Sequence, residues 1–114
     1  MLGQNLINRI TSEVSQRVQA LLGHRLRNII LFGSCARGDY NDESDVDIMV
    51  LADFDESEIS VLRNEISLIS NDVSLENDIT VCILLYNNQF FESHLHISPF
   101  YRNVKNEGVV LYAS

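Results

Sequence analysis

The chain has 114 residues, enough for one small hydrophobic core and too few for two. Its 46% content of hydrophobic residues excludes wholesale disorder, and no apolar run reaches the roughly 20 residues of a membrane helix. Eight basic and 16 acidic residues give a net charge of −8, which disfavours binding to a nucleic-acid backbone because such binding depends on Lys and Arg.

Apolar residues recur at helical spacing from Leu6 onward, and Gly23 is a typical helix stop. A continuous apolar run then ends at the Gly33-Ser34 step, as expected for a buried strand followed by a turn. After a polar loop, a second apolar run begins at Asp45. The expected elements of this half are a helix over 6–22, a strand over 26–32, a short helix over 34–37 and a strand over 45–51.

Asp55 and Glu58 have the spacing of a capping box, which predicts the start of a long helix whose apolar stripe continues to Val73. A run of β-branched and aliphatic residues predicts the next strand. Ser98-Pro99 is typical of an N-cap followed by the first helical residue. The expected elements of this half are a helix over 57–73, a strand over 79–86, a helix from Ser98 that closes near Gly108 and a short edge strand over 109–112.

This order predicts one α/β (α+β) domain over residues 1–114, with a small mixed β-sheet of three to four strands covered by helices. We expect the strand over 45–51 to lie beside those over 26–32 and 79–86, and the helices over 6–22 and 57–73 to cover the sheet. Two cysteines and the lack of a signal-peptide pattern predict a cytoplasmic protein.

Two aspartates one residue apart, Asp45 and Asp47, open the second strand. Residues i and i+2 of a strand point to the same face, so we expect their carboxylates to converge. Mg²⁺ is commonly held by one or two carboxylates together with substrate phosphates. The pair therefore predicts a metal site, the alternative being that both side chains are solvated at the entrance to a strand.

The turn before the short helix supplies candidate phosphate ligands. Gly33 lets the backbone approach phosphate oxygens, and Ser34 adds a hydroxyl next to the first N–H groups of a helix. Arg37 offers a guanidinium to neutralise phosphate charge. The alternatives are an ordinary strand-to-helix turn with a serine N-cap, and an ion pair of Arg37 with Asp39 or Asp42.

Residues 33–38 read Gly-Ser-Cys-Ala-Arg-Gly, and residues 44–47 read Ser-Asp-Val-Asp. These motifs and their spacing resemble the signature of the minimal nucleotidyltransferases of the DNA polymerase β superfamily. The segment over 98–104 is similar to the closing segment of many small members. The resemblance implies a polymerase β-like nucleotidyltransferase fold and a Mg²⁺- or Mn²⁺-dependent transfer of a nucleoside monophosphate from ATP or another NTP to a hydroxyl.

The resemblance also implies a third carboxylate on a neighbouring strand, where it completes the metal site and helps to deprotonate the attacking hydroxyl. Asp78 is the best candidate by position, and Thr80, which cannot act as the base, is the alternative occupant of that place. The expected catalytic and metal-binding residues are thus Asp45, Asp47 and Asp78, and the expected nucleotide-binding residues are Gly33, Ser34 and Arg37.

Many chains of this kind are paired with a helical HEPN-type toxin, so the resemblance implies an antitoxin that adds AMP to its toxin. A second interpretation is a binding module with a vestigial site, which neutralises the toxin by complex formation. The third alternative, an antibiotic nucleotidyltransferase, is disfavoured because its substrate pocket needs more chain. The negative charge disfavours free nucleic acid as the acceptor, and homo-oligomer formation stays open.

Overall fold

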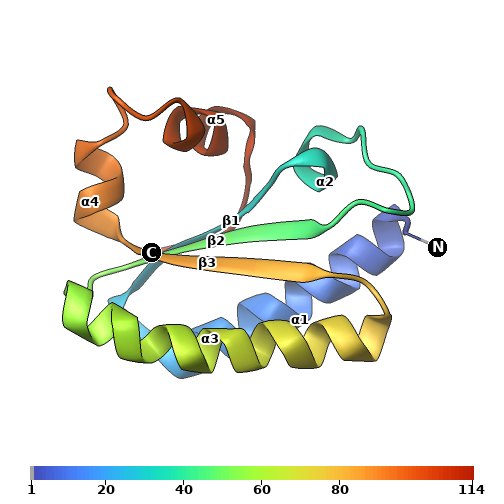
Figure 1. Cartoon of the computed structure of the whole chain (residues 1–114), viewed down its shortest axis with the longest axis horizontal. Coiled ribbons are helices and arrows are strands. Elements are labelled where there is room, and N and C mark those ends of the chain that lie inside the picture. The colour runs from blue at the N-terminus through green and yellow to red at the C-terminus, as the bar shows by residue number, and fades with distance from the viewer. Residues whose placement is uncertain (1) are drawn as a thin grey trace.

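A four-stranded mixed sheet with helices on both faces organises residues 2–114, the part of the chain that the computed structural model describes (Figure 1). The strands are β1 (Leu26–Phe32), β2 (Val46–Ala52), β3 (Val81–Asn87) and β4 (Val109–Ala113). The helices are α1 (Gln4–Leu22), the 3₁₀ turn η1 (Gly23–Arg25), α2 (Ser34–Arg37), α3 (Glu56–Asn77), α4 (Asn88–Ser93) and α5 (Pro99–Glu107). None of the helices in this part of the chain is long and apolar enough to cross a membrane.

The strand order is β3-β2-β1-β4, so β2 lies between β1 and β3 as predicted. β1 runs antiparallel to β2 and β4, whereas β3 runs parallel to β2 after the crossover helix α3. This architecture confirms the predicted α/β (α+β) class. In the register of the sheet, Asp47 pairs with Phe32 on β1 and with Cys82 on β3.

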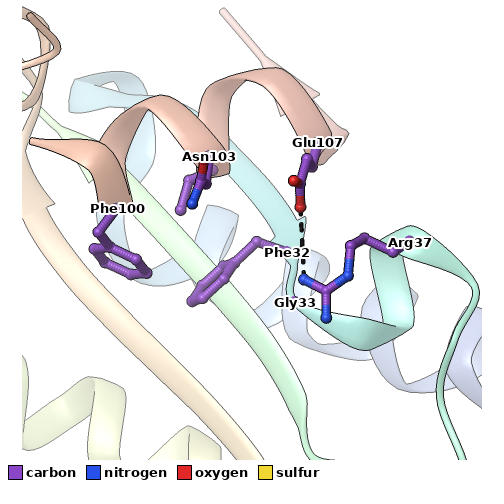
Figure 2. Close-up of a pocket in the computed structure, with 7 residues that line it drawn as sticks. Phe32, Gly33, Arg37, Phe100, Asn103 and Glu107 are labelled. Atoms are coloured by element: carbon purple, nitrogen blue, oxygen red, sulfur yellow. Dashed lines mark ion pairs between the residues drawn. The ribbon is translucent and has the colours of Figure 1, made fainter.

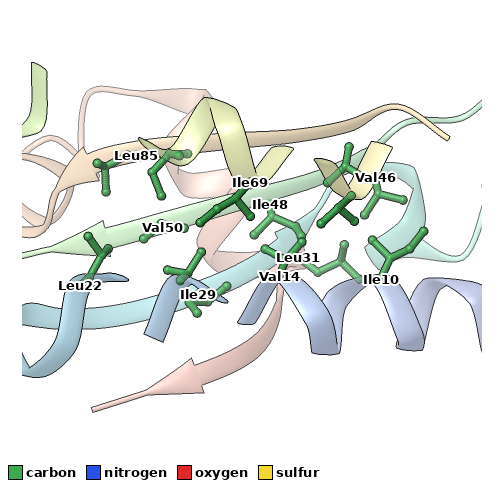
Figure 3. Close-up of a cluster of buried hydrophobic side chains, with 14 of the residues drawn as sticks. Ile10, Val14, Leu22, Ile29, Leu31, Val46, Ile48, Val50, Ile69 and Leu85 are labelled. Carbon is green, nitrogen blue, oxygen red and sulfur yellow. The ribbon is translucent and has the colours of Figure 1, made fainter. Parts of the chain in front are cut away.

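The face of the sheet covered by α1 and α3 holds the larger hydrophobic core (Figure 3). Alternate strand residues, among them Ile29, Ile48 and Val50, point into this core because side chains of a strand alternate between its faces. Both helices meet them with apolar residues at three- and four-residue spacing, namely Ile10, Val14, Val18, Ile59, Ile66, Ile69 and Val73. The predicted covering of the sheet by these two helices is confirmed.

α4 and α5 lie over the opposite face of the sheet (Figure 1). A smaller core fills the space between these helices and the sheet. Ile30 of β1 and Met49 and Leu51 of β2 are buried in it, and the two helices add Phe91, Tyr101 and Val104. The sequence pattern does not predict α4, whose N-cap is the Asn87 side chain. Asp47 precedes Met49 by two residues, so its side chain lies on this face and not on the α1–α3 face.

Two predicted boundaries around the α3–β3 connection are wrong. α3 continues beyond Val73 to Asn77, whose side chain donates a hydrogen bond to the Val73 carbonyl at 2.8 Å. Asp78 then ends the helix in the left-handed conformation, with φ 52° and ψ 40°. β3 therefore begins at Val81 and not at residue 79. The predicted capping box of α3 and N-cap of α5 are both present.

Candidate active site

Asp45 and Asp47 lie together at the start of β2. Asp45 is exposed and directly precedes the strand, whereas Asp47 is half-buried within it. Burial and then the negative charge of Asp45 raise the pKa of Asp47. The two carboxylates therefore share one small region, and a cation bound between them would relieve their repulsion.

The glycine turn (Gly33-Ser34), which joins β1 to α2, packs directly against Asp47. Gly33 has φ 75° and ψ −158°, a conformation that is essentially restricted to glycine. A Cβ atom on Gly33 would lie 2.7 Å from Oδ2 of Asp47. The carbonyl of Gly33 accepts hydrogen bonds from the N–H groups of Ala36 and Arg37, each at 3.1 Å. The turn thus brings the start of α2, where N–H groups lack helical acceptors, beside the carboxylate.

Cys35 connects α2 to the aspartates. Its buried thiol donates a hydrogen bond to the carbonyl of Asp45, with Sγ and O 3.4 Å apart. Burial and the charges of Asp47 and Asp45 raise the pKa of this thiol. A protonated, buried thiol is a poor nucleophile, so Cys35 serves to hold the loop before β2 in place.

Arg37 ends α2 and forms two ion pairs across exposed surface. Its Nε lies 3.3 Å from Oδ2 of Asp39, and its Nη1 lies 3.5 Å from Oε2 of Glu107 (Figure 2). The ion pair with Asp39 is the alternative that the sequence left open. A phosphate that binds Arg37 would have to compete with both carboxylates.

A pocket of about 340 Å³ opens beside the glycine turn (Figure 2). The rings of Phe32 and Phe100 meet edge to face in it, with centroids 5.6 Å apart. Of the residues that line the pocket, the sequence analysis predicted only Gly33 and Arg37 as nucleotide-binding residues. The spacing of Phe100, Asn103 and Glu107, which places them on one face of a helix, could have indicated the others. The full lining is Phe32, Gly33, Arg37, Phe100, Asn103, Val104 and Glu107.

The structure does not bring Asp78 to the aspartate pair. Asp78 is the exposed C-cap of α3, and no three His, Cys, Asp or Glu side chains within residues 2–114 form a group that could hold a metal. Thr80 lies just before β3, and its carbonyl pairs with the first N–H of β2. The residue beside Asp47 on β3 is Cys82. Burial and the charges of Asp47 and Asp45 raise the pKa of the Cys82 thiol.

The donor set at the start of β2 fits a divalent cation that arrives with a nucleotide. Asp45 and Asp47 supply hard oxygen donors on one side of the strand. The remaining ligands would come from phosphate oxygens and water, which is the usual way in which proteins bind Mg²⁺ with a nucleotide. The residues present are thus suited to hold such a complex.

A mixed sheet with an aspartate pair beside a glycine turn is the arrangement that the sequence resemblance to nucleotidyltransferases led us to expect. Residues 7–111 match the family model of the nucleotidyltransferase domain, and the chain belongs to that family of enzymes. The chain is 36% identical over 88 residues to the "Putative protein adenylyltransferase MJ0604" of Methanocaldococcus jannaschii, covering 77% of this chain and 80% of that protein. It is 34% identical over 102 residues to "Putative protein adenylyltransferase MJ0141" of the same organism, covering 88% of this chain and 93% of that protein.

Solved structures share the fold. A toxin-antitoxin complex with AMP-PNP has a TM-score of 0.54 at 22% identity, covering 99% of this chain and 75% of that chain. A putative nucleotidyltransferase from Sulfolobus solfataricus has a TM-score of 0.52 at 19% identity, covering 96% and 85%. A mutant of the toxin-antitoxin MntA-HpeT has a TM-score of 0.53 at 20% identity, covering 99% and 75%. These similarities confirm the predicted nucleotidyltransferase fold.

Proposed function

We propose that this nucleotidyltransferase transfers AMP from ATP to a hydroxyl group of a partner protein, with Mg²⁺ or Mn²⁺ as the cofactor. The observation that carries the proposal is the close approach of Gly33 to the Asp47 carboxylate, which joins a phosphate-binding turn to a cation-binding pair. Two relatives named as putative protein adenylyltransferases support the choice of AMP and of a protein acceptor.

In this reaction the acceptor oxygen forms a bond to the α-phosphorus of ATP, and the bond from that phosphorus to the leaving oxygen breaks. Pyrophosphate leaves, and the hydroxyl proton passes to solvent. Asp45 and Asp47 hold the divalent cation, which when bound neutralises phosphate charge and lowers the pKa of the acceptor hydroxyl. The backbone of Gly33 and the N–H and hydroxyl groups of Ser34 position the β- and γ-phosphates, and Arg37 balances their charge.

The charge around the site favours a protein acceptor over a free nucleic acid. Nine of the 16 acidic residues lie between positions 39 and 58, with no Lys or Arg among them. In the fold, Arg25 pairs with Glu58, Arg27 with Asp53 and Arg37 with Asp39. Most of the other acidic residues of this segment lie in the loop before β2 or at the start of that strand, namely Asp42, Glu43, Asp45 and Asp47. This loop repels a phosphate backbone, whereas a partner protein can present basic residues to it.

Exposed apolar side chains on the α4–α5 side supply a surface for such a partner. Phe90, Ile97 and Phe100 are 44%, 61% and 42% exposed. They belong to the helical layer over the sheet face that bears Asp47, so a docked partner would lie close to the site (Figure 1). The toxin-antitoxin neighbours support the choice of a toxin as partner, with this chain as its antitoxin. The sequence resemblance described above adds that this toxin is of the helical HEPN type.

The test is intact-mass spectrometry of the product of the neighbouring gene, as the candidate toxin, after incubation with the chain, Mg²⁺ and each NTP in turn. We expect a mass gain of one or more AMP units with ATP, and none with the Asp45→Asn variant. A primer-extension gel run in parallel should show no elongation of DNA or RNA oligonucleotides. Extension of free primers with an unmodified toxin would contradict the proposal.

Cys82 favours a second candidate, in which the chain neutralises its toxin mainly by binding. A neutral side chain in the place of the third carboxylate leaves the acceptor hydroxyl without a protein base. The same mass spectra separate the two candidates, because a tight complex whose toxin gains no mass would favour binding alone.

A further inference from the structure

We infer that Cys82 occupies the place of the third carboxylate, so that this chain holds its cation with two carboxylates only and transfers nucleotide without a side-chain base. The inference deepens the proposed function and rests on it. According to this inference, Cys82 limits both the affinity for metal and nucleotide and the rate of AMP transfer.

The register of the sheet places Cys82. In the parallel ladder between β2 and β3, Cys82 is the partner of Asp47. Val81 and Leu85 of β3 are buried in the larger core, whereas Tyr86 packs against the smaller core on the other face. Because side chains alternate along a strand, Cys82 shares its face with Tyr86 and therefore with Asp47.

Neighbouring strands lie about 4.8 Å apart, so a carboxylate at position 82 would be within reach of a cation held by Asp47. The thiol is a poor substitute, because hard cations such as Mg²⁺ prefer oxygen ligands. It is also a poor base, because an ordinary cysteine thiol is mostly protonated at neutral pH. A carboxylate at position 82 would thus complete a three-carboxylate site, whereas the thiol leaves the cation with two carboxylates.

Three variants test this inference. Cys82→Asp adds the missing carboxylate, and Cys82→Asn adds a side chain of nearly the same shape as aspartate but without its charge. Cys82→Ser replaces the thiol by a hydroxyl. Calorimetry with Mn²⁺ and AMP-PNP measures metal–nucleotide affinity without any acceptor. We expect Cys82→Asp to bind about tenfold more tightly, and Cys82→Asn and Cys82→Ser to stay within about twofold of wild type. With ATP and the toxin, Cys82→Asp should raise the rate of AMP transfer by about tenfold or more.

The outcomes separate this inference from the proposed function. Normal binding by wild type with no gain in Cys82→Asp would overturn the inference and leave the proposed function standing. A large loss of binding in Cys82→Ser would also overturn it, because the thiol itself would then be a ligand; this result does not depend on how well Cys82→Asp folds. Absence of binding in wild type and all three variants would overturn the proposed function together with the inference.

Discussion

Oδ2 of Asp47 lies 2.7 Å from the point where a Cβ atom of residue 33 would stand. The carboxylate and the glycine turn are therefore one structural unit, although Asp47 belongs to β2 and the turn follows β1. Gly33 is the first residue after β1, and Phe32 before it pairs with Asp47 across the ladder. Antiparallel pairing thus fixes the distance between the turn and the carboxylate.

Replacement of Gly33 by alanine should damage both the fold and the site. The new Cβ would clash with Asp47 in a backbone conformation that alanine rarely adopts. We expect the free energy of unfolding to fall by about 2–3 kcal/mol and Mg²⁺–ATP affinity to fall about tenfold or more. Gly38→Ala is the matched control, since Gly38 also has positive φ but no atom within 4 Å of an added Cβ. It should cost about 1 kcal/mol and leave affinity unchanged by calorimetry.

Removal of either aspartate charge should abolish the metal-dependent part of nucleotide binding without unfolding the protein. Asp47→Asn removes one of two repelling carboxylates, so its unfolding free energy should equal or exceed that of wild type in urea. Asp45→Asn should lose affinity in the same way. Glu43→Gln, which removes one charge from the same acidic loop, is the control; an equal loss in this variant would indicate a general charge effect.

Acidification should weaken Mg²⁺–ATP binding at a pH above the ordinary aspartate value of 3.8, because the pKa of Asp47 is raised and the cation needs its ionised form. The raised pKa also affects stability. The folded state loses stability as pH rises from the ordinary aspartate pKa of 3.8 through the raised pKa of Asp47 in the folded protein. Asp47→Asn should therefore be more stable than wild type at neutral pH and equal to it below pH 3.8. Urea titrations at both ends of this range measure the difference.

Glu107 should restrain Arg37 from binding phosphate, because their side chains are already paired at 3.5 Å. Glu107→Gln should strengthen ATP binding, and Arg37→Ala should weaken it, each by about threefold to tenfold for an exposed charged contact. Glu92→Gln offers a matched control, since Glu92 pairs with Lys105 and not with Arg37. Unchanged affinity in both test variants would remove Arg37 from the nucleotide site.

A charge placed in the exposed apolar surface over α4 and α5 should weaken binding of the proposed toxin partner and spare nucleotide binding. Ile97→Lys puts an ammonium where a 61% exposed isoleucine stands, and we expect at least about tenfold weaker complex formation. Leu75→Lys changes an 83% exposed leucine on α3, which covers the opposite face of the sheet. Biolayer interferometry would contradict this docking surface if Leu75→Lys, and not Ile97→Lys, lost affinity.

Much of the fold and part of the candidate site follow from local sequence patterns. The proximity of Asp45 and Asp47 follows from their separation by one residue at the start of β2, and the turn at Gly33 needs only the break in an apolar run. The capping box of α3 and the N-cap of α5 are likewise set by residues three positions apart. Such features are predictable because their causes lie within one or two turns of chain.

The tertiary structure alone decided which residue stands beside the aspartate pair. Asp78 was the sequence candidate and Thr80 the alternative. However, α3 runs on to Asn77, Asp78 becomes its left-handed cap, and Thr80 lies just before β3. The parallel register of β2 and β3 then sets Cys82 against Asp47. That register depends on how a 22-residue crossover helix packs on the sheet, a sum of contacts between residues distant in the chain, and local periodicity carries no information about it. The pocket beside Gly33 has the same origin, because it forms only where α5 folds back onto β1.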